Sequence, residues 1–166
     1  MLDGLRVLDL TTGIAGAYCA KLLTDLGADT VFTDPLDGDP LTESRRTPQR
    51  LVSAYADWLD RADLVIVGAP DRVPGAPPPV TVAITALGHG GPDDGLHLTE
   101  EVLQARSGSL AAHGHSHLPP LTVGGRLGEY IVGAFAALGG VTAWSRAART
   151  GVPETVDASM LEAMQM

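Results

Sequence analysis

Short apolar runs alternate with longer amphipathic segments along the first half of the chain, and this alternation limits the folds that the chain can adopt. The runs are rich in Val, Leu and Ile and are short enough to be buried strands. They occupy residues 5–10, 30–34, 63–68 and 80–87. Parallel strands joined by helices form one sheet with helices on its faces. The sequence therefore predicts an α/β fold with a parallel sheet flanked by helices.

Several segments between and after these runs predict helices, whereas residues 69–79 are too rich in Pro and Gly for a helix or a strand. Leu and Ala spacing favours a helix that ends at Gly27, and a second helix over 47–62 is expected to begin at Thr47, with Pro48 in its first turn. Further helices are expected over 98–112 and 128–150. Residues 154–159 predict one more strand, and residues 160–166 begin an apolar helix. We therefore expect residues 1–166 to be one incomplete domain, which is a fragment or half of a longer or split protein.

Composition and charge exclude several classes of function. The chain has 166 residues and a formal net charge of -9, so its field repels nucleic acid and anionic membrane, and we expect neither as a partner. The run after Glu129 is interrupted by glycines and stopped by Arg146, which we take as too short for a membrane span. The lone Cys19 and the absence of an export signal predict a cytoplasmic protein.

The turn "TTGIAGA", residues 11–17, lies between the first strand and the first helix. Open α/β sheets bind anionic groups at such a turn, because free backbone N–H groups and the helix dipole converge there. Its glycines, Gly13 and Gly16, do not have the spacing of the dinucleotide-binding motif, although Asp34 ends the second strand where a ribose-binding acid would lie. The turn is therefore either a site for a phosphate-bearing cofactor or a place of tight packing.

One carboxylate, Glu129, stands in the glycine-rich stretch "GGRLGEYIVGAFAALGG", residues 124–140. A carboxylate in the first turn of a helix is favoured by the helix dipole. Uncrowded glycines also leave room for a ligand to reach it as a reactive group. The residues themselves leave both interpretations open. His113, His115 and His117 alternate in a polar loop without a neighbouring carboxylate or thiol, and we predict no metal site.

The order of the motifs along the chain resembles the N-terminal half of the family III CoA-transferases. The matching segments cover nearly the whole chain. They are "LDGLRVLDLTTGIAGAYCAKLLTDLGAD", "DPLDGDP", "ADLVIV", "ITALGHGGP", "SGSLAAHG", "PPLTVGGRLGEYIVGAFAALGGVTAWSRAARTG" and "VDASMLEA". This family includes formyl-CoA transferase, carnitine CoA-transferase and α-methylacyl-CoA racemase.

The resemblance implies a Rossmann-like large domain, chains interlocked in a homodimer, and coenzyme A lying over the turn after the first strand at Ile14, Ala15 and Gly16. In the family's transferases an Asp at the position of Glu129 attacks the acyl-CoA thioester, and CoA passes through an enzyme thioester to an acceptor carboxylic acid. The family's basic stretch and its following strand, between the second and third predicted strands, are missing. The nearest substitutes for its CoA-binding cations are Arg45, Arg46 and Arg72.

We therefore expect a CoA-transferase that acts on an acyl-CoA and a carboxylic acid, with a second copy or a partner chain supplying the C-terminal half. Two alternatives are a catalytically silent relative that pairs with an active subunit and a nucleotide-binding α/β module that uses Asp34. The racemase is disfavoured because its catalytic His falls at Thr99.

Overall fold

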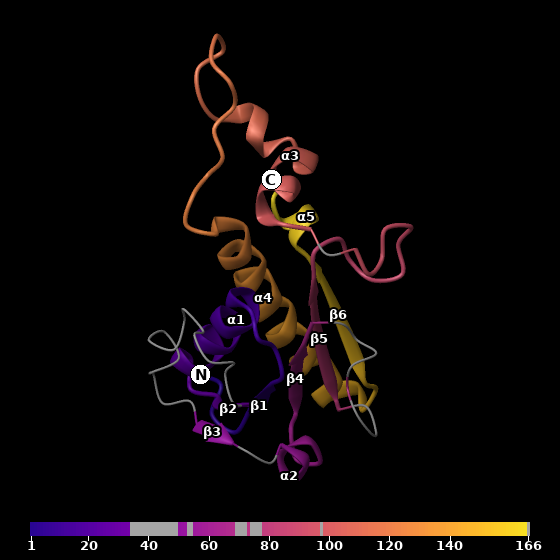
Figure 1. Cartoon of the computed structure of the whole chain (residues 1–166). Helices are drawn as coiled ribbons and strands as arrows, with labels where there is room; N and C mark the ends of the chain where they lie inside the picture. The colour runs from indigo at the N-terminus through magenta and orange to yellow at the C-terminus, as the bar shows by residue number, and fades with distance from the viewer. Residues whose placement is uncertain (34–49, 53–54, 69–72, 74–77, 97, 166) are drawn as a thin grey trace.

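The computed structural model describes residues 1–33, 50–52, 55–68, 73, 78–96 and 98–165, and it contains one parallel sheet (Figure 1). Six strands pair in the order β3-β2-β1-β4-β5-β6. They span Arg6–Asp9 (β1), Asp29–Thr33 (β2), Arg50–Val52 (β3), Leu64–Val67 (β4), Val80–Thr85 (β5) and Glu154–Ser159 (β6). All pairings are parallel, as predicted, and the order reverses direction between β1 and β4, as in a doubly wound fold.

Helices connect the strands. They are α1 (Ile14–Asp25), α2 (Ala56–Leu59), α3 (Glu100–Ser107), the 3-10 helix η3 (Ser109–Ala112), α4 (Leu127–Thr150) and α5 (Met160–Ala163). Helices α1 and α4 lie beside each other against the sheet, whereas α3 lies beyond the carboxyl end of the sheet (Figure 1). The strand at 154–159 and the helix at 128–150 agree with the sequence-based predictions.

The central strands are apolar on both faces because helices or loops cover both sides. Alternate residues, such as Val7, Leu64 and Val82, belong to the core cluster beneath α1 and α4. Their neighbours along the strands, such as Leu8 and Val65, belong to the cluster on the opposite face, which includes Ala62. This two-residue alternation is what a pleated strand imposes.

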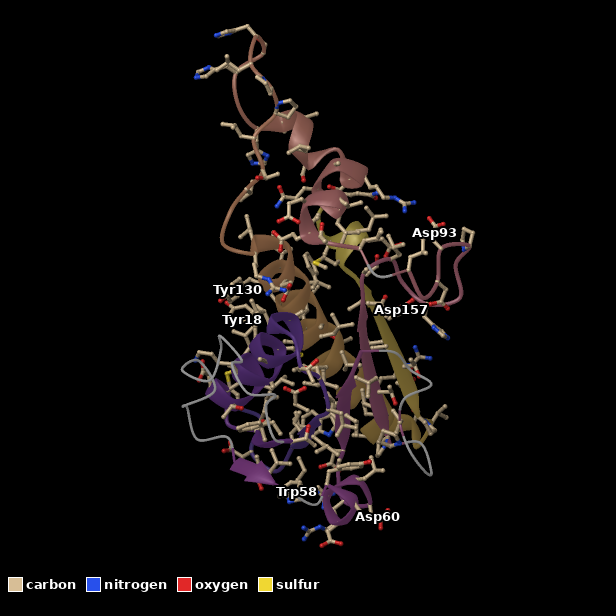
Figure 2. The ribbon with its side chains drawn as sticks, viewed as in Figure 1. Tyr18, Trp58, Asp60, Asp93, Tyr130 and Asp157 are labelled. Carbon is tan, nitrogen blue, oxygen red and sulfur yellow. The ribbon has the colours of Figure 1, made fainter. Side chains whose placement is uncertain are left out.

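Helices α1 and α4 approach each other closely where their contact residues are small. A Cβ atom on Gly133 would lie 2.6 Å from the carbonyl oxygen of Ala15, closer than real Cβ contacts. Tyr18 and Tyr130 extend this contact with an edge-to-face ring pair whose centroids are 5.0 Å apart (Figure 2). The crossing fixes the first turn of α4 against the N-terminus of α1.

The structure corrects the prediction for residues 47–62. Residues Arg50–Val52 form strand β3, paired in parallel with β2, and helix α2 contains only Ala56–Leu59. The strand that the sequence appeared to lack after the second strand is therefore present. Pairing with the edge of β2 outweighs a helical pattern whose apolar spacing is only a local preference.

The predicted helix over 98–112 is interrupted. Gly108 adopts a left-handed φ of 83°, ends α3 and separates it from η3. A left-handed residue is a common helix end, and glycine adopts it without steric cost.

Helix α4 is long and apolar enough to cross a membrane by length and composition alone. The prediction that this run is too short for a membrane span is therefore wrong as far as length and composition are concerned. The core helix of a soluble protein can have the same length and the same apolar composition. Residues Val132, Ala136 and Ala143 of α4 belong to the core cluster shared with α1 and the sheet, so α4 is a core helix of this domain.

Candidate active site

Glu129 lies in the first turn of α4, and its position depends on an unusual backbone conformation just before the helix. Arg126, the N-cap residue, has φ 57° and ψ 42°, and it is the one described non-glycine residue with a positive φ. Such a conformation is uncommon for a residue with a long side chain. The backbone N–H of Glu129 donates to the carbonyl oxygen of Arg126 over 3.1 Å. This turn directs the Glu129 side chain toward α1.

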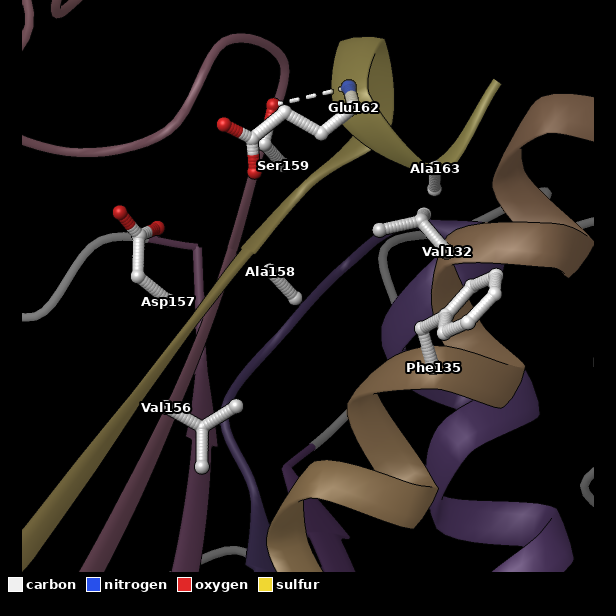
Figure 3. A pocket seen from close by; sticks show the side chains of 8 residues that line it. All are labelled: Val132, Phe135, Val156, Asp157, Ala158, Ser159, Glu162 and Ala163. Carbon is white, nitrogen blue, oxygen red and sulfur yellow. Dashed lines mark hydrogen bonds between the residues drawn. The ribbon is translucent and has the colours of Figure 1, made fainter. Parts of the chain in front are cut away.

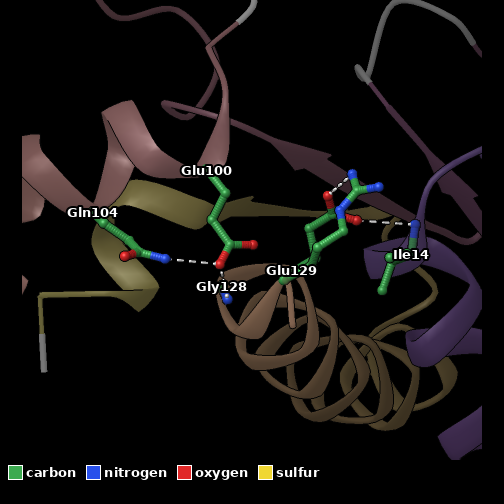
Figure 4. Close-up of polar contacts among 6 residues, drawn as sticks. Ile14, Glu100, Gln104, Gly128 and Glu129 are labelled. Carbon is green, nitrogen blue, oxygen red and sulfur yellow. Dashed lines mark hydrogen bonds and ion pairs between the residues drawn. The ribbon is translucent and has the colours of Figure 1, made fainter. Parts of the chain in front are cut away.

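Both carboxylate oxygens of Glu129 are engaged (Figure 4). Oε2 accepts a hydrogen bond from the backbone N–H of Ile14 over 3.1 Å, and Oε1 pairs with the guanidinium of Arg126. The Glu129 side chain is only 11% exposed, whereas Arg126 is 58% exposed. A carboxylate that is largely removed from water is thus held by one N–H group and one cation.

The contact with Ile14 brings together two parts of the site that the sequence presents separately. Ile14 is the first residue of α1, and the N-cap residue Gly13 has no side chain to accept its N–H. Glu129 supplies that acceptor from another helix, at the positive end of the α1 dipole. The dipole interpretation of Glu129 therefore holds, and the helix concerned is α1 as well as α4.

Helix α3 supports the segment before Glu129 through two polar side chains. Oε1 of Glu100 accepts from the backbone N–H of Gly128 and from the Gln104 side chain, each over 3.1 Å (Figure 4). Gln104 also exchanges two hydrogen bonds of 2.9 Å with the backbone of Val123. No sequence motif marks these residues as part of a site, although Glu100 and Gln104 are four apart on a predicted helix and so share a face.

A pocket of about 460 Å³ opens beside Glu129, between the start of α3, the glycine-rich segment and the first turn of α4. Its lining consists of Leu98, Thr99, Glu100, Glu101, Thr122, Val123, Gly124, Gly125, Arg126, Glu129 and Met160. Hydrogen bonds from its own backbone N–H and from Thr99 lower the pKa of Glu101, and the charge of Arg126 contributes further. The pocket therefore holds several carboxylates around one guanidinium.

The turn predicted to bind CoA is closely packed. The side chains of Ile14 and Ala15 are buried, at 6% and 9% exposure. A Cβ atom on Gly16 would collide with the side chain of Thr11, whose hydroxyl donates to Asp9 over 2.6 Å. Packing thus accounts for Gly16 directly. A ligand at this turn would meet its backbone and its exposed residues Thr12 and Gly13 rather than the two buried side chains, and CoA binding there stays a prediction.

The cations suggested as substitutes for CoA binding, Arg45, Arg46 and Arg72, lie outside the described residues, as does Asp34. His115 and His117 lie with their ring centroids 5.6 Å apart in an exposed loop. Within the part of the chain that the structure describes, no group of three potential ligands could hold a metal ion. The expectation of no metal remains a prediction.

A second pocket, of about 260 Å³, lies between α4 and β6 (Figure 3). It is lined by Val132, Phe135, Val156, Asp157, Ala158, Ser159, Glu162 and Ala163. This lining carries carboxylates but no Lys or Arg, so the groove does not suit a phosphate-bearing ligand. The pocket beside Glu129, which includes a guanidinium, is the better candidate for an anionic substrate.

The doubly wound parallel sheet with its flanking helices defines a Rossmann-like α/β domain, and in it a buried carboxylate lies against the N-terminus of the first helix. The sequence pattern of CoA-transferase family III matches residues 2–66 and 73–166. The chain belongs to this family.

The curated relatives carry CoA-transferase names. A succinyl-CoA:mesaconate CoA-transferase of Haloarcula hispanica is 27% identical over 207 aligned positions, which include 98% of this chain and 52% of that protein. A formyl-CoA:oxalate CoA-transferase of Rhodopseudomonas palustris is 28% identical over 201 positions, covering 96% of this chain and 46% of that protein. The chain spans about half the length of the curated relatives it matches.

Solved structures share the fold. A CaiB/BaiF family protein of Brucella suis superimposes with a TM-score of 0.81 at 24% identity, covering 99% of this chain and 54% of that one. A protein of Mycobacterium tuberculosis superimposes with a TM-score of 0.79 at 22% identity, covering 98% and 55%. These likenesses confirm the predicted α/β fold, and this chain matches about half of each of these structures.

Proposed function

We propose that the chain is the nucleophile-bearing part of a CoA-transferase that moves CoA from an acyl-CoA to a carboxylic acid through Glu129. The observation that carries the proposal is the placement of Glu129: a carboxylate that is 11% exposed, fixed by Ile14 and Arg126 beside a pocket of about 460 Å³. Membership of the family and the CoA-transferase names of the relatives support it.

The chemistry requires one carboxylate to act as both nucleophile and carrier. An oxygen of Glu129 attacks the acyl carbon of the thioester, the carbon–sulfur bond breaks, and the electron pair leaves with the CoA thiolate. The thiolate then attacks Cδ of Glu129, and the donor acid leaves as a carboxylate. An acceptor carboxylate reverses these two steps: it displaces the thiolate from Cδ, and the thiolate then attacks the acceptor's acyl carbon and frees Glu129.

The neighbouring residues suit this use of Glu129. The N–H of Ile14 and the guanidinium of Arg126 orient the carboxylate through one hydrogen bond and one ion pair. Glu100 and Gln104 hold Gly128 and Val123 and so fix the glycine-rich segment from which Glu129 projects. Gly124 and Gly125 line the pocket, and we propose their backbone N–H groups as the donors for the oxyanion of an acyl intermediate.

We extend the proposal to the whole assembly. The acyl-CoA and the acceptor acid are small molecules in solution, and the chain works with a second copy or a partner chain, in the interlocked homodimer that the family resemblance implies. A cytoplasmic location agrees with the single buried cysteine. Neither a silent relative nor a nucleotide-binding module is favoured, because the relatives are named CoA-transferases.

Chemical trapping tests the role of Glu129. The complete protein is incubated with succinyl-CoA and hydroxylamine, and the peptide containing Glu129 is analysed by mass spectrometry for a hydroxamate. We expect labelling in the wild type and in the control Glu162→Gln, whose exposed side chain lies outside the pocket beside Glu129, and none in Glu129→Gln. Turnover in Glu129→Gln equal to that of the wild type would show that the carboxylate only caps α1.

Glu129→Asp tests whether the pocket has adapted to the longer side chain. Removal of one methylene withdraws the carboxylate from the Ile14 N–H, which Glu129 reaches at 3.1 Å. A displacement of about 1 Å can lower the rate on the order of a hundredfold. We therefore expect Glu129→Asp to label more slowly, and labelling as fast as the wild type would contradict the geometry.

A further inference from the structure

We propose that Arg126 is the binding residue for the acceptor acid, and that it becomes available only when Glu129 is esterified. In the resting protein its guanidinium is occupied by Oε1 of Glu129. The inference rests on the proposed function of Glu129, and it assigns the second substrate, a carboxylate, to a particular side chain of the same site.

The position of Arg126 suits an exchange of partners. Its side chain is 58% exposed, whereas the Glu129 side chain that it pairs with is 11% exposed. The guanidinium therefore lies between a buried carboxylate and the pocket that both residues line. Because a guanidinium offers several donors in one plane, it can bind a carboxylate from the pocket with two parallel hydrogen bonds.

The backbone shows that an arginine at this position is specifically accommodated. Arg126 adopts φ 57° directly after Gly125, whose φ is 78°. Glycine adopts this conformation at no steric cost, whereas a side-chain-bearing residue pays for it. A residue with a long charged side chain in such a conformation points to a function that a glycine would not serve.

The charges of the pocket explain why the exchange must follow esterification. The pocket is lined by three carboxylates, Glu100, Glu101 and Glu129, and among its described lining residues Arg126 is the only Lys or Arg. With Glu129 ionised, an incoming carboxylate meets an excess of negative charge and an occupied guanidinium. Like charges at short range oppose binding.

Formation of the Glu129 thioester changes this balance. The bond between Cδ and the CoA sulfur replaces the Cδ–O bond, the donor acid leaves with the negative charge, and Glu129 becomes neutral. Arg126 then has no anionic partner on Glu129 and can hold the acceptor carboxylate next to Cδ, the atom that it must attack. The acid substrate therefore binds to the esterified protein in preference to the resting protein.

Glu129→Gln imitates the neutral, esterified side chain and allows a binding test without turnover. The dissociation constant of succinate is measured by isothermal titration with the complete protein carrying Glu129→Gln, and with the wild type. We expect roughly tenfold or tighter binding to Glu129→Gln, because a hydrogen-bonded ion pair no longer competes for Arg126. The double variant Arg126→Gln/Glu129→Gln should lose this gain.

A matched control uses an arginine within α4. Arg146 pairs with Glu154 over 2.9 Å and does not line the pocket, so Arg146→Gln/Glu129→Gln should bind succinate as tightly as Glu129→Gln. Arg126→Lys/Glu129→Gln keeps the charge and should restore part of the gain. The inference is wrong if Glu129→Gln binds succinate no more tightly than the wild type, or if removal of Arg126 leaves the tighter binding intact.

The outcome can be separated from that of the proposed function, because hydroxamate trapping reports esterification of Glu129 independently. Trapping without a gain in succinate binding overturns the role of Arg126 alone. A gain in succinate binding without hydroxamate formation supports the carboxylate site at Arg126 and refutes the role of Glu129 as the nucleophile. If Glu129→Gln does not fold, Arg126→Gln is used alone: the KM for the acid should rise roughly tenfold, and by more than the KM for succinyl-CoA, whereas an unaltered KM for the acid, or an equal rise in both KM values, refutes the inference.

Discussion

The bond between Glu129 and the N-terminus of α1 predicts that this carboxylate contributes to stability as well as to chemistry. Glu129→Ala removes the acceptor of the Ile14 N–H and the partner of Arg126. A hydrogen bond to a charged group contributes about 1.5–3 kcal/mol, and an ion pair with an exposed arginine about 1 kcal/mol or less. We therefore expect the free energy of unfolding to fall by about 2–3 kcal/mol in Glu129→Ala.

Glu129→Gln should cost less than Glu129→Ala. The amide oxygen can still accept from the Ile14 N–H, so the loss is limited to the charge, about 1 kcal/mol from the helix dipole and the ion pair together. Urea unfolding followed by circular dichroism gives both values from the shift of the midpoint at constant slope. Glu162→Ala, an exposed acid on α5, is the control and should change stability by less than about 0.5 kcal/mol.

A double-mutant cycle isolates the bond to Ile14. Ile14 is the first residue of α1, where proline is tolerated, and Gly13 has the extended conformation (φ -103°, ψ 169°) that a following proline needs. Ile14→Pro removes the N–H, and the cycle cancels the loss of the isoleucine side chain. In this background Glu129→Ala should cost only about 1 kcal/mol or less. An equal cost of Glu129→Ala in both backgrounds would refute the reasoning.

Two further predictions concern groups outside the site. Burial, and secondarily the charge of Asp9, raises the pKa of the Cys19 thiol far above its usual range. A thiol reagent at pH 8 should therefore modify Cys19 only after unfolding, and rapid reaction with the folded protein would contradict the burial of this thiol. Hydrogen bonds from the Arg6 side chain lower the pKa of Asp63. The stability that the ionised Asp63 contributes is therefore complete above its unfolded-state pKa of about 3.9, and it is lost as the pH falls through its lower folded-state pKa. Asp63→Asn should reduce the free energy of unfolding by about 1 kcal/mol at pH 7 and flatten its decline below pH 4, as measured by urea unfolding across that range; an unchanged acid limb would contradict the assignment.

Local patterns in the sequence were sufficient for most of the elements. Strand Leu64–Val67 is a continuous apolar run, as in a sheet covered on both faces, and Val80–Thr85 is rich in β-branched residues. Helix α4 has the length and composition of a core helix. The parallel sheet was predicted because strands alternate with helices along the first part of the chain. The end of the helix at Gly108 could also have been predicted from the residue type, because glycine commonly ends a helix.

The short strand β3 could not be predicted in this way. Its three residues, Arg50–Val52, lie in a segment whose apolar spacing fits a helix, and nothing local distinguishes them. Their strand conformation depends on hydrogen bonds to β2, an element that comes earlier in the chain. Backbone pairing of this kind is decided by which edge is available, which only the assembled sheet determines.

The sequence alone identified Glu129 as a carboxylate at a helix start, and the resemblance of its motifs identified the family. It did not show that Glu129 would bind the N–H of Ile14, which lies 115 residues away along the chain, or that Glu100 and Gln104 would hold the segment before it. Hydrophobic periodicity is local and can be read residue by residue, whereas a polar contact between two helices depends on their crossing. That crossing is set by the close approach of Gly133 to Ala15, and therefore only the tertiary structure could decide which groups surround the carboxylate.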